Sequence, residues 1–273
     1  DDRKIGRDAE DIRAPVQPIG QDLPVGDHIG ADGAHAVIFF LLGAQETRSD
    51  RIGIRGQKGG RKSPPIVNAA WPIYPVYFWD GRADSLVAQA KGPIDNPIEM
   101  GNTHEAAART IGEIAGYHAH FKEVFGDSGV TIDRIAEAIA AYEATRLSGN
   151  SKFDRFVKGD KSALNAQEQR GKELFEGKAT CIECHLSLNF TDSKFHNLGI
   201  GWDEKAQKFA DEGRAKVSND PLDLGAFKTP GLRDVSRHAP YMHDGSLATL
   251  KDVVLHYDKG GNRNPKLDAK MKH

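Results

Sequence analysis

The two cysteines of this 273-residue chain stand in one pentapeptide, Cys-Ile-Glu-Cys-His, at residues 181–185. Two thiols at this spacing can form thioether bonds with the two vinyl groups of a haem, and the imidazole of His185 can then reach the iron. A thioredoxin-like pair would need a βαβ setting, and structural zinc would need further Cys or His ligands. The motif therefore predicts haem c attached to Cys181 and Cys184, with His185 as an iron ligand.

Helical patterns dominate the rest of the chain. Apolar residues recur at helical spacing behind a capping residue in the segments 103–114, 131–143, 165–175 and 249–257. The third of these segments leads toward Cys181. Alternating strand patterns are scarce, so we expect an all-α chain. Its 29 glycines and 13 prolines predict long loops around short helices, and a large cofactor would fill the core.

The length of the chain indicates how many domains it forms, and its net charge indicates which classes of partner it can bind. A chain of 273 residues exceeds the usual size of a single core, and the polar stretch 148–153 is the best linker, so we expect domains at 1–150 and 151–273. With 37 Lys and Arg against 39 Asp and Glu, the net charge is −2, which argues against a nucleic-acid partner. The longest apolar stretch, residues 36–44, is too short to cross a bilayer.

The haem motif also predicts where the protein works. Thioether attachment of haem c takes place outside the cytoplasm in bacteria. No basic and apolar leader with a cleavage site opens the sequence. We therefore expect a mature, exported protein in the periplasm.

Four segments resemble the bacterial di-haem cytochrome c peroxidase family, including its MauG-type branch. They are 63–71 (SPPIVNAAW), 78–101 (FWDGRADSLVAQAKGPIDNPIEMG), 227–235 (FKTPGLRDV) and 239–257 (APYMHDGSLATLKDVVLHY). The resemblance runs from about residue 52 to the C-terminus. It implies two cytochrome-c-like domains, each with a haem at its core, and hydrogen peroxide as the oxidant. Residues 181–185 correspond to the second, electron-transferring haem of the family.

The same resemblance implies three catalytic residues. Trp79 corresponds to the tryptophan between the two haems, a relay for electrons or holes. Glu99 corresponds to the distal acid above the peroxide-binding iron, and Gln89 to the amide beside it. A positioned carboxylate can take a proton from one peroxide oxygen and deliver it to the other, which contributes roughly 10²–10⁴-fold. Without the motif, Glu99 would be read as a solvated surface acid and Trp79 as a core residue.

Tyr257 distinguishes the branches of the family. Classical members carry a Met as the sixth ligand of the second haem, and this sequence has Tyr257 at that position, as the MauG-type branch does. A phenolate stabilises oxidised iron and lowers the reduction potential, whereas a thioether favours reduced iron. The alternatives are that Tyr257 is a core residue or that Met242 is the ligand.

The first haem motif of the family has no counterpart here. By register, residues 30–51 occupy its segment, with Val37, Phe40 and Leu41 where Cys, Cys and His would fall. Either the first haem is lost and the apolar run fills its pocket, or residues 1–50 do not represent the segment that the folded protein carries. Since Trp79, Gln89 and Glu99 have their implied roles only around a first haem, we favour the second interpretation.

Histidine positions bear on that first haem. His28 and His35 could ligate a non-covalent haem. No histidine occurs between His35 and His104, so the loop where classical peroxidases carry a displaceable distal His has none. This too resembles the MauG-type branch.

The resemblance also implies a calcium ion between the two domains, bound by an Asn side chain and loop carbonyls. Lys62 stands where that Asn is expected, whereas the loop of Thr229 is retained. Thr229 is therefore the candidate calcium ligand.

The leading hypothesis is MauG-like: hydrogen peroxide oxidises the haems to a high-valent di-haem state, which then oxidises residues of a partner protein. One alternative is a classical cytochrome c peroxidase that reduces peroxide to water with electrons from a small cytochrome or copper protein. A third hypothesis is a non-catalytic, mono-haem electron-transfer or sensor protein.

Overall fold

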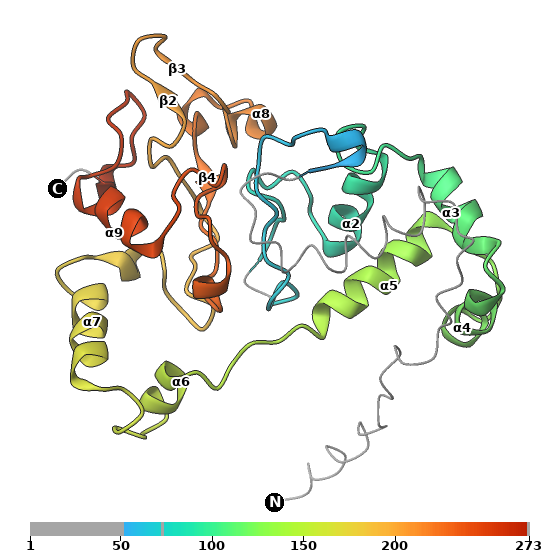
Figure 1. Cartoon of the computed structure of the whole chain (residues 1–273), viewed down its shortest axis with the longest axis horizontal. Helices are drawn as coiled ribbons and strands as arrows, with labels where there is room; N and C mark the ends of the chain where they lie inside the picture. Colours follow the sequence, from blue (N-terminus) through green and yellow to red (C-terminus); the bar gives the residue numbers. More distant parts are fainter. Residues whose placement is uncertain (1–51, 72–73, 272–273) are drawn as a thin grey trace, which may run out of the picture.

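The computed structural model describes residues 52–71 and 74–271 (Figure 1). The segment 30–51, with Val37, Phe40 and Leu41, and the histidines His28 and His35 lie outside the described residues. The interpretations placed on that segment therefore stay predictions.

Short helices and long loops make up the described chain. The helices are α2 (Leu86–Asp95), α3 (His104–Gly112), α4 (Ala115–Phe125), α5 (Ile132–Ala144), α6 (Lys152–Val157), α7 (Ala166–Glu176), α8 (Ala215–Ser218) and α9 (Leu250–Asp258). The strands are β1 (Phe195–His196), β2 (Trp202–Asp203), β3 (Lys208–Phe209) and β4 (Phe227–Lys228). No helix among the described residues is long and apolar enough to span a bilayer.

The expectation of an all-α chain needs a correction. β1 pairs with β4 in antiparallel register, with His196 opposite Phe227, and β2 pairs with β3, with Trp202 opposite Phe209. Each strand has only two residues, too few to show the alternation by which a strand is read from sequence. The chain is mainly helical and carries two small ladders.

Capping residues set the helix starts as the sequence predicts. Thr131 accepts a side-chain hydrogen bond at the start of α5, and Asn165 and Thr249 form capping boxes at the starts of α7 and α9. The helix predicted over 103–114 is shorter than expected. It ends at Gly112, a residue of low helix propensity, and α4 begins at Ala115.

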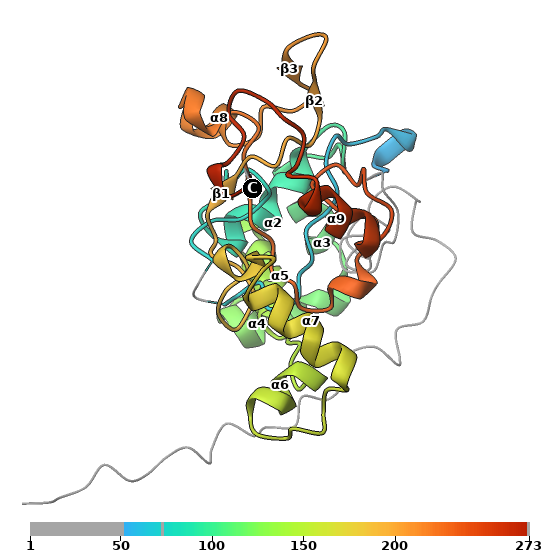
Figure 2. The same cartoon turned by 90° about the vertical axis from the view of Figure 1, so that its left-hand side faces the viewer.

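The helices form two groups (Figures 1 and 2). In one, α5 packs against α2 and α3 and buries Ala90 and Ile94 of α2 with Ile135 and Ala136 of its own. In the other lie α7, α9 and the two ladders. The segment 146–151 runs without secondary structure from α5 to α6, and it contains the predicted boundary at residue 150. The division into two domains stays a prediction.

Loop contacts join the two groups. The backbone N–H of Lys228 donates to the carbonyl of Trp79 at 2.8 Å. The Arg214 guanidinium donates to the carbonyls of Asp80 and Gly81 at 3.0 and 3.1 Å. These bonds fix the Trp79 turn against the C-terminal loops.

Candidate functional site

The Cys-x-x-Cys-His motif forms a single tight turn after α7. Residues Cys181–Glu183 form one turn of 3-10 helix, and the N–H of His185 donates to the carbonyl of Cys181 at 2.9 Å. Both thiols are free and half-buried. The turn therefore presents two thiols and one imidazole together, as haem attachment requires.

His185 is held as a neutral ligand would be. Its Nδ1 lies 2.8 Å from the carbonyl oxygen of Phe190, and burial lowers the pKa of the imidazole. A neutral histidine whose Nδ1–H is donated to a carbonyl presents the lone pair of Nε2, which is the usual bond to a metal.

Tyr257 on α9 lies beside the same motif. Burial raises the pKa of its phenol, and charge on Cys184 and Cys181 raises it further, so the phenol is buried within electrostatic range of both cysteines. The preceding residue, His256, is directed away, with Nε2 3.0 Å from the carbonyl of Leu198. Of these two neighbours, Tyr257 is therefore the one whose side chain is influenced by the cysteines of the motif.

A second histidine borders the motif from β1. His196 lies between Asp192 and Asp268, at 2.9 and 2.6 Å. Burial alone would lower the pKa of His196, but hydrogen bonds with Cys184 and the two aspartates raise it to about 9. His196 and Asp192 therefore lie within 4.8 Å of the Cys184 sulfur.

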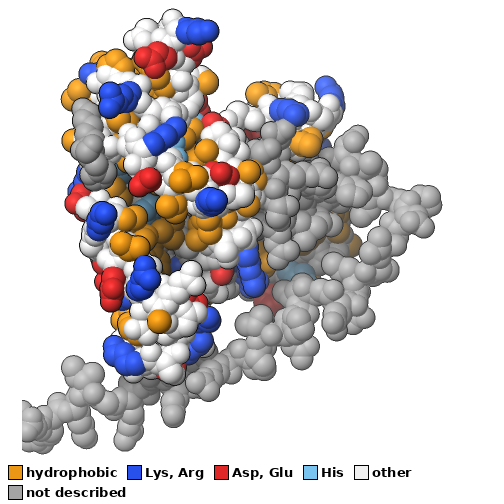
Figure 3. Space-filling model, turned by 60° about the vertical axis from the view of Figure 1, so that its left-hand side comes forward, with side chains coloured by type: hydrophobic (Ala, Val, Ile, Leu, Met, Phe, Trp, Pro, Cys, Tyr) orange, Lys and Arg blue, Asp and Glu red, His pale blue; other side chains and the backbone are white. Residues whose placement is uncertain are grey.

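The surroundings fit an apolar cofactor. The elements that carry the motif and Tyr257 leave large apolar side chains exposed, and Figure 3 shows hydrophobic side chains gathered on the face that these elements form. The exposed apolar residues of these elements include Leu174, Ile182, Leu186, Leu188, Leu250, Val254 and Leu255. Two thiols, an imidazole, a phenol and an apolar rim are the groups that would hold haem c.

Trp79 is fixed at both ends. Its indole Nε1 donates to the carbonyl of Lys62 at 2.8 Å, and its own carbonyl accepts from Lys228. The turn that follows requires glycine, because Gly81 has a φ of +70° and a Cβ there would come within 2.5 Å of the Phe195 ring. The rigid indole forms part of the walls of two cavities.

The first cavity is polar and contains Glu99. It measures about 480 Å³ and is also lined by Arg82, Asp211 and His243, a size within the roughly 300–1,000 Å³ of small-molecule sites. Glu99 follows α2, and its carbonyl accepts from the N–H of Ile54 at 2.7 Å. A carboxylate beside basic groups in such a cavity can move protons for a small polar substrate.

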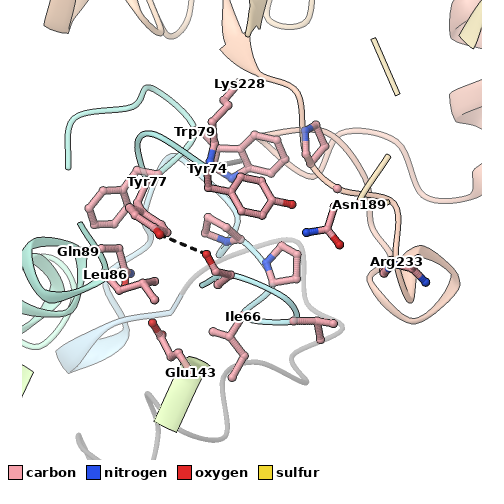
Figure 4. A pocket seen from close by; sticks show the side chains of 17 residues that line it. Ile66, Tyr74, Tyr77, Trp79, Leu86, Gln89, Glu143, Asn189, Lys228 and Arg233 are labelled. Carbon is pink, nitrogen blue, oxygen red and sulfur yellow. Dashed lines mark hydrogen bonds between the residues drawn. The ribbon is translucent and has the colours of Figure 1, made fainter. Parts of the chain in front are cut away.

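The second cavity is small and apolar and contains Gln89. It measures about 90 Å³, and Tyr74, Tyr77 and Leu86 line it together with Trp79 (Figure 4). The structure therefore places Gln89 and Glu99 in the linings of two different cavities, with Trp79 common to both.

Sequence analysis missed two ionisable residues of the apolar cavity. Glu143 of α5 is 3% exposed, its Oε2 has no hydrogen-bond partner among the described residues, and burial raises its pKa to about 7. Lys228 donates to the carbonyl of Val76 at 2.8 Å, and burial lowers its pKa to about 8. The sequence did contain a signal for Glu143, because this acidic residue falls within the apolar stripe of residues 131–143.

The residues at the expected calcium site do not fit calcium. Thr229 is buried, its hydroxyl lies 3.4 Å from the carbonyl of Lys194, and its own carbonyl accepts from the hydroxyl of Thr191 at 2.7 Å. Lys62 presents an ammonium group where calcium needs an oxygen ligand. Both residues are committed to other contacts.

Comparisons with known proteins agree with the resemblance found in the sequence. A family profile described as di-haem cytochrome c peroxidase matches residues 40–162. The methylamine utilization protein MauG of Methylorubrum extorquens is 41% identical over 215 residues, which cover 78% of this chain and 59% of that protein. The cytochrome-c peroxidase IdrP1 of Denitromonas iodatirespirans is 35% identical over 284 residues, 93% of this chain and 75% of that protein.

A solved structure gives the same result for the fold. A MauG-like protein associated with microbial copper homeostasis superposes with a TM-score of 0.75 at 28% identity, over 85% of this chain and 75% of that one. The chain spans about three fifths of the length of the first curated relatives that it matches. The sequence and the fold agree, and the chain belongs to the di-haem cytochrome c peroxidase family.

Proposed function

We propose that this protein uses hydrogen peroxide to oxidise residues of a partner protein, in the manner of the MauG branch of its family. The observation that carries this proposal is Tyr257 of α9, whose phenol is buried within electrostatic range of Cys181 and Cys184. A hard, anionic oxygen ligand favours high oxidation states of iron. The identity with a protein named MauG supports the same branch.

The cofactor is haem c, bound through Cys181 and Cys184, with His185 and Tyr257 as iron ligands. When bound, haem supplies the exchange of electrons with peroxide and with the partner. His185 contributes a neutral imidazole oriented by the carbonyl of Phe190. Without haem, burial keeps the Tyr257 phenol protonated. Its ionisation would therefore need a cation, such as the haem iron, at this site.

The other site residues act around Trp79. Glu99 takes and returns a proton in the polar cavity, and Gln89 contributes an amide from the apolar side. Trp79 carries charge between the two parts of the site, since one hydrogen bond from its indole and one to its backbone carbonyl hold it at a fixed place. We propose a second haem next to this tryptophan, at the N-terminal part of the chain, and a periplasmic location for the whole.

The alternative function is that of a classical cytochrome c peroxidase, with a small cytochrome or copper protein as electron donor. The relatives named cytochrome-c peroxidase favour it. A Met ligand would suit that function, but the residue near the cysteines is Tyr257. The mono-haem carrier hypothesis differs from both in its haem content.

Haem stoichiometry tests the proposal. A pyridine haemochrome assay gives the total haem, and the intact mass gives the covalent haem. We expect a total of two haems per chain, of which the one at Cys181 and Cys184 is covalent. A fully loaded protein with one haem in total would reject both peroxidase functions and leave the carrier.

A further inference from the structure

The ammonium group of Lys62 lies buried at the junction between the two groups of helices. Lys62 is 9% exposed. Its Nζ donates to the carbonyl oxygens of His238 and Pro240, the latter at 2.7 Å, and it lies 6.0 Å from the centre of the Tyr241 ring. Lysine is almost never this buried unless its charge is paired, so these oxygens serve as the partners of a cation.

The backbone of the same residue ties Trp79 to the loop that follows these carbonyls. The N–H of Lys62 donates to the carbonyl of His243 at 2.7 Å, and its carbonyl accepts from the Trp79 indole. One residue therefore binds the 238–243 loop through its side chain and through its N–H, and orients Trp79 through its carbonyl. A displacement of the Lys62 ammonium group would therefore also displace the carbonyl that orients the Trp79 indole.

We propose that the Lys62 ammonium is the resident cation of this junction and stands in place of the calcium ion that the family resemblance would put there. Calcium would require six to eight oxygen ligands at 2.3–2.6 Å. Here a lysine replaces the expected Asn oxygen, and two carbonyl oxygens already point at its Nζ. An ammonium group and a divalent cation cannot share these oxygens, because the two charges repel and the spaces overlap.

The neighbouring histidine is consistent with a charge at this position. Burial lowers the pKa of His238, and the positive charge of Lys62 lowers it further. Thr229, the candidate calcium ligand, is hydrogen-bonded to Lys194 and Thr191. The junction is thus complete without a metal, and this inference does not depend on the peroxide chemistry.

The wild-type protein gives the first test. Thermal unfolding and calorimetric titration of the haem-loaded protein are measured in calcium chloride, in magnesium chloride and in a calcium chelator. We expect the same Tm in all three and no heat of calcium binding. A rise in Tm that calcium produces and magnesium does not would overturn the proposal, and this measurement needs no variant.

Two substitutions give the second test. Lys62→Met keeps most of the unbranched side chain but leaves the two carbonyls without a cation, so we expect a Tm lower by roughly 4–8 °C. Lys62→Asn restores an oxygen ligand, and we expect saturating calcium to raise its Tm by roughly 5 °C. A Met variant that melts like the wild type, or an Asn variant indifferent to calcium, would show that the two carbonyls are not a cation site.

Discussion

The indole Nε1 of Trp79 and the backbone carbonyl of Lys62 are joined by a hydrogen bond of 2.8 Å. The N–H of a buried tryptophan usually finds such an acceptor. Trp79 is held by its backbone carbonyl as well, and it lines a polar and an apolar cavity. Such a fixed position suits a charge relay, because electron transfer depends on a constant separation between the partners.

Replacing Trp79 with Phe tests the relay. Phe fills most of the space but has no N–H donor and is harder to oxidise than Trp, so we expect intact haem content and a slower peroxide-driven oxidation, by at least roughly tenfold, or about 1.4 kcal/mol of barrier. Stopped-flow spectra of the haem-loaded protein measure the rate. Trp71→Phe is the matched control, since Trp71 is 38% exposed. Equal rates in the two variants would remove Trp79 from the pathway.

Glu99→Gln tests the proton shuttle. Gln has nearly the same size but no basicity, so we expect normal folding and haem content, with the reaction with peroxide slowed by roughly 10²–10⁴-fold. The rate of haem oxidation at several peroxide concentrations measures it. Glu105→Gln, at an exposed position of α3, is the control. A variant as fast as the wild type would reject the role.

The helices could be predicted largely from local chemistry. Thr131, Asn165 and Thr249 cap their helices as predicted, because a cap depends on residues within three positions of it. The two strand ladders could not be predicted in this way. Phe195 pairs with Lys228, which lies far along the chain, and no local sequence pattern indicates strands of two residues.

The candidate site, too, has a part that local sequence predicts and a part that depends on long-range packing. The thiols and imidazole of residues 181–185 are adjacent in sequence, so the motif alone predicts their common turn. Gln89 and Glu99 line different cavities because of the way the turns around α2 pack against Trp79. This packing joins residues that are distant in sequence, so the sequence alone does not predict it. The roles of Lys62 and Glu143 depend on burial, which spacing does not report for single charged residues.

Glu143 predicts a pH dependence of stability. Its pKa is about 7 when folded and 4.5 ordinarily, so between these values the folded chain holds a proton that the unfolded chain has lost. The free energy of unfolding therefore falls as pH rises through this window, by up to about 3 kcal/mol. Glu143→Gln removes this loss and should be the more stable protein at pH 8, with the advantage shrinking toward pH 4.5.

Thermal unfolding of both proteins between pH 4.5 and 8 measures this difference. Glu137→Gln, an exposed position of the same helix, should show no such trend. A constant difference in Tm across the range would mean that Glu143 is ionised in the fold.

Tyr257 decides between the two peroxidase functions. Tyr257→Phe keeps the ring for packing and removes only the oxygen, so if that oxygen binds iron we expect changed optical and EPR spectra of the covalent haem. Tyr142→Phe, at a 39% exposed position, should leave them as they are. Unchanged spectra in Tyr257→Phe would make Tyr257 a core residue.

Tyr257→Met tests how this ligand affects function. A His and Met pair raises the reduction potential of haem relative to an anionic oxygen ligand, so a potentiometric titration should give a higher midpoint than in the wild type. Electron acceptance from a small redox donor should then improve, whereas oxidation of a partner protein should weaken because the fully oxidised state is harder to reach. A variant that gains or loses both activities together would contradict the proposed role, since the ligand would then not set the balance between them.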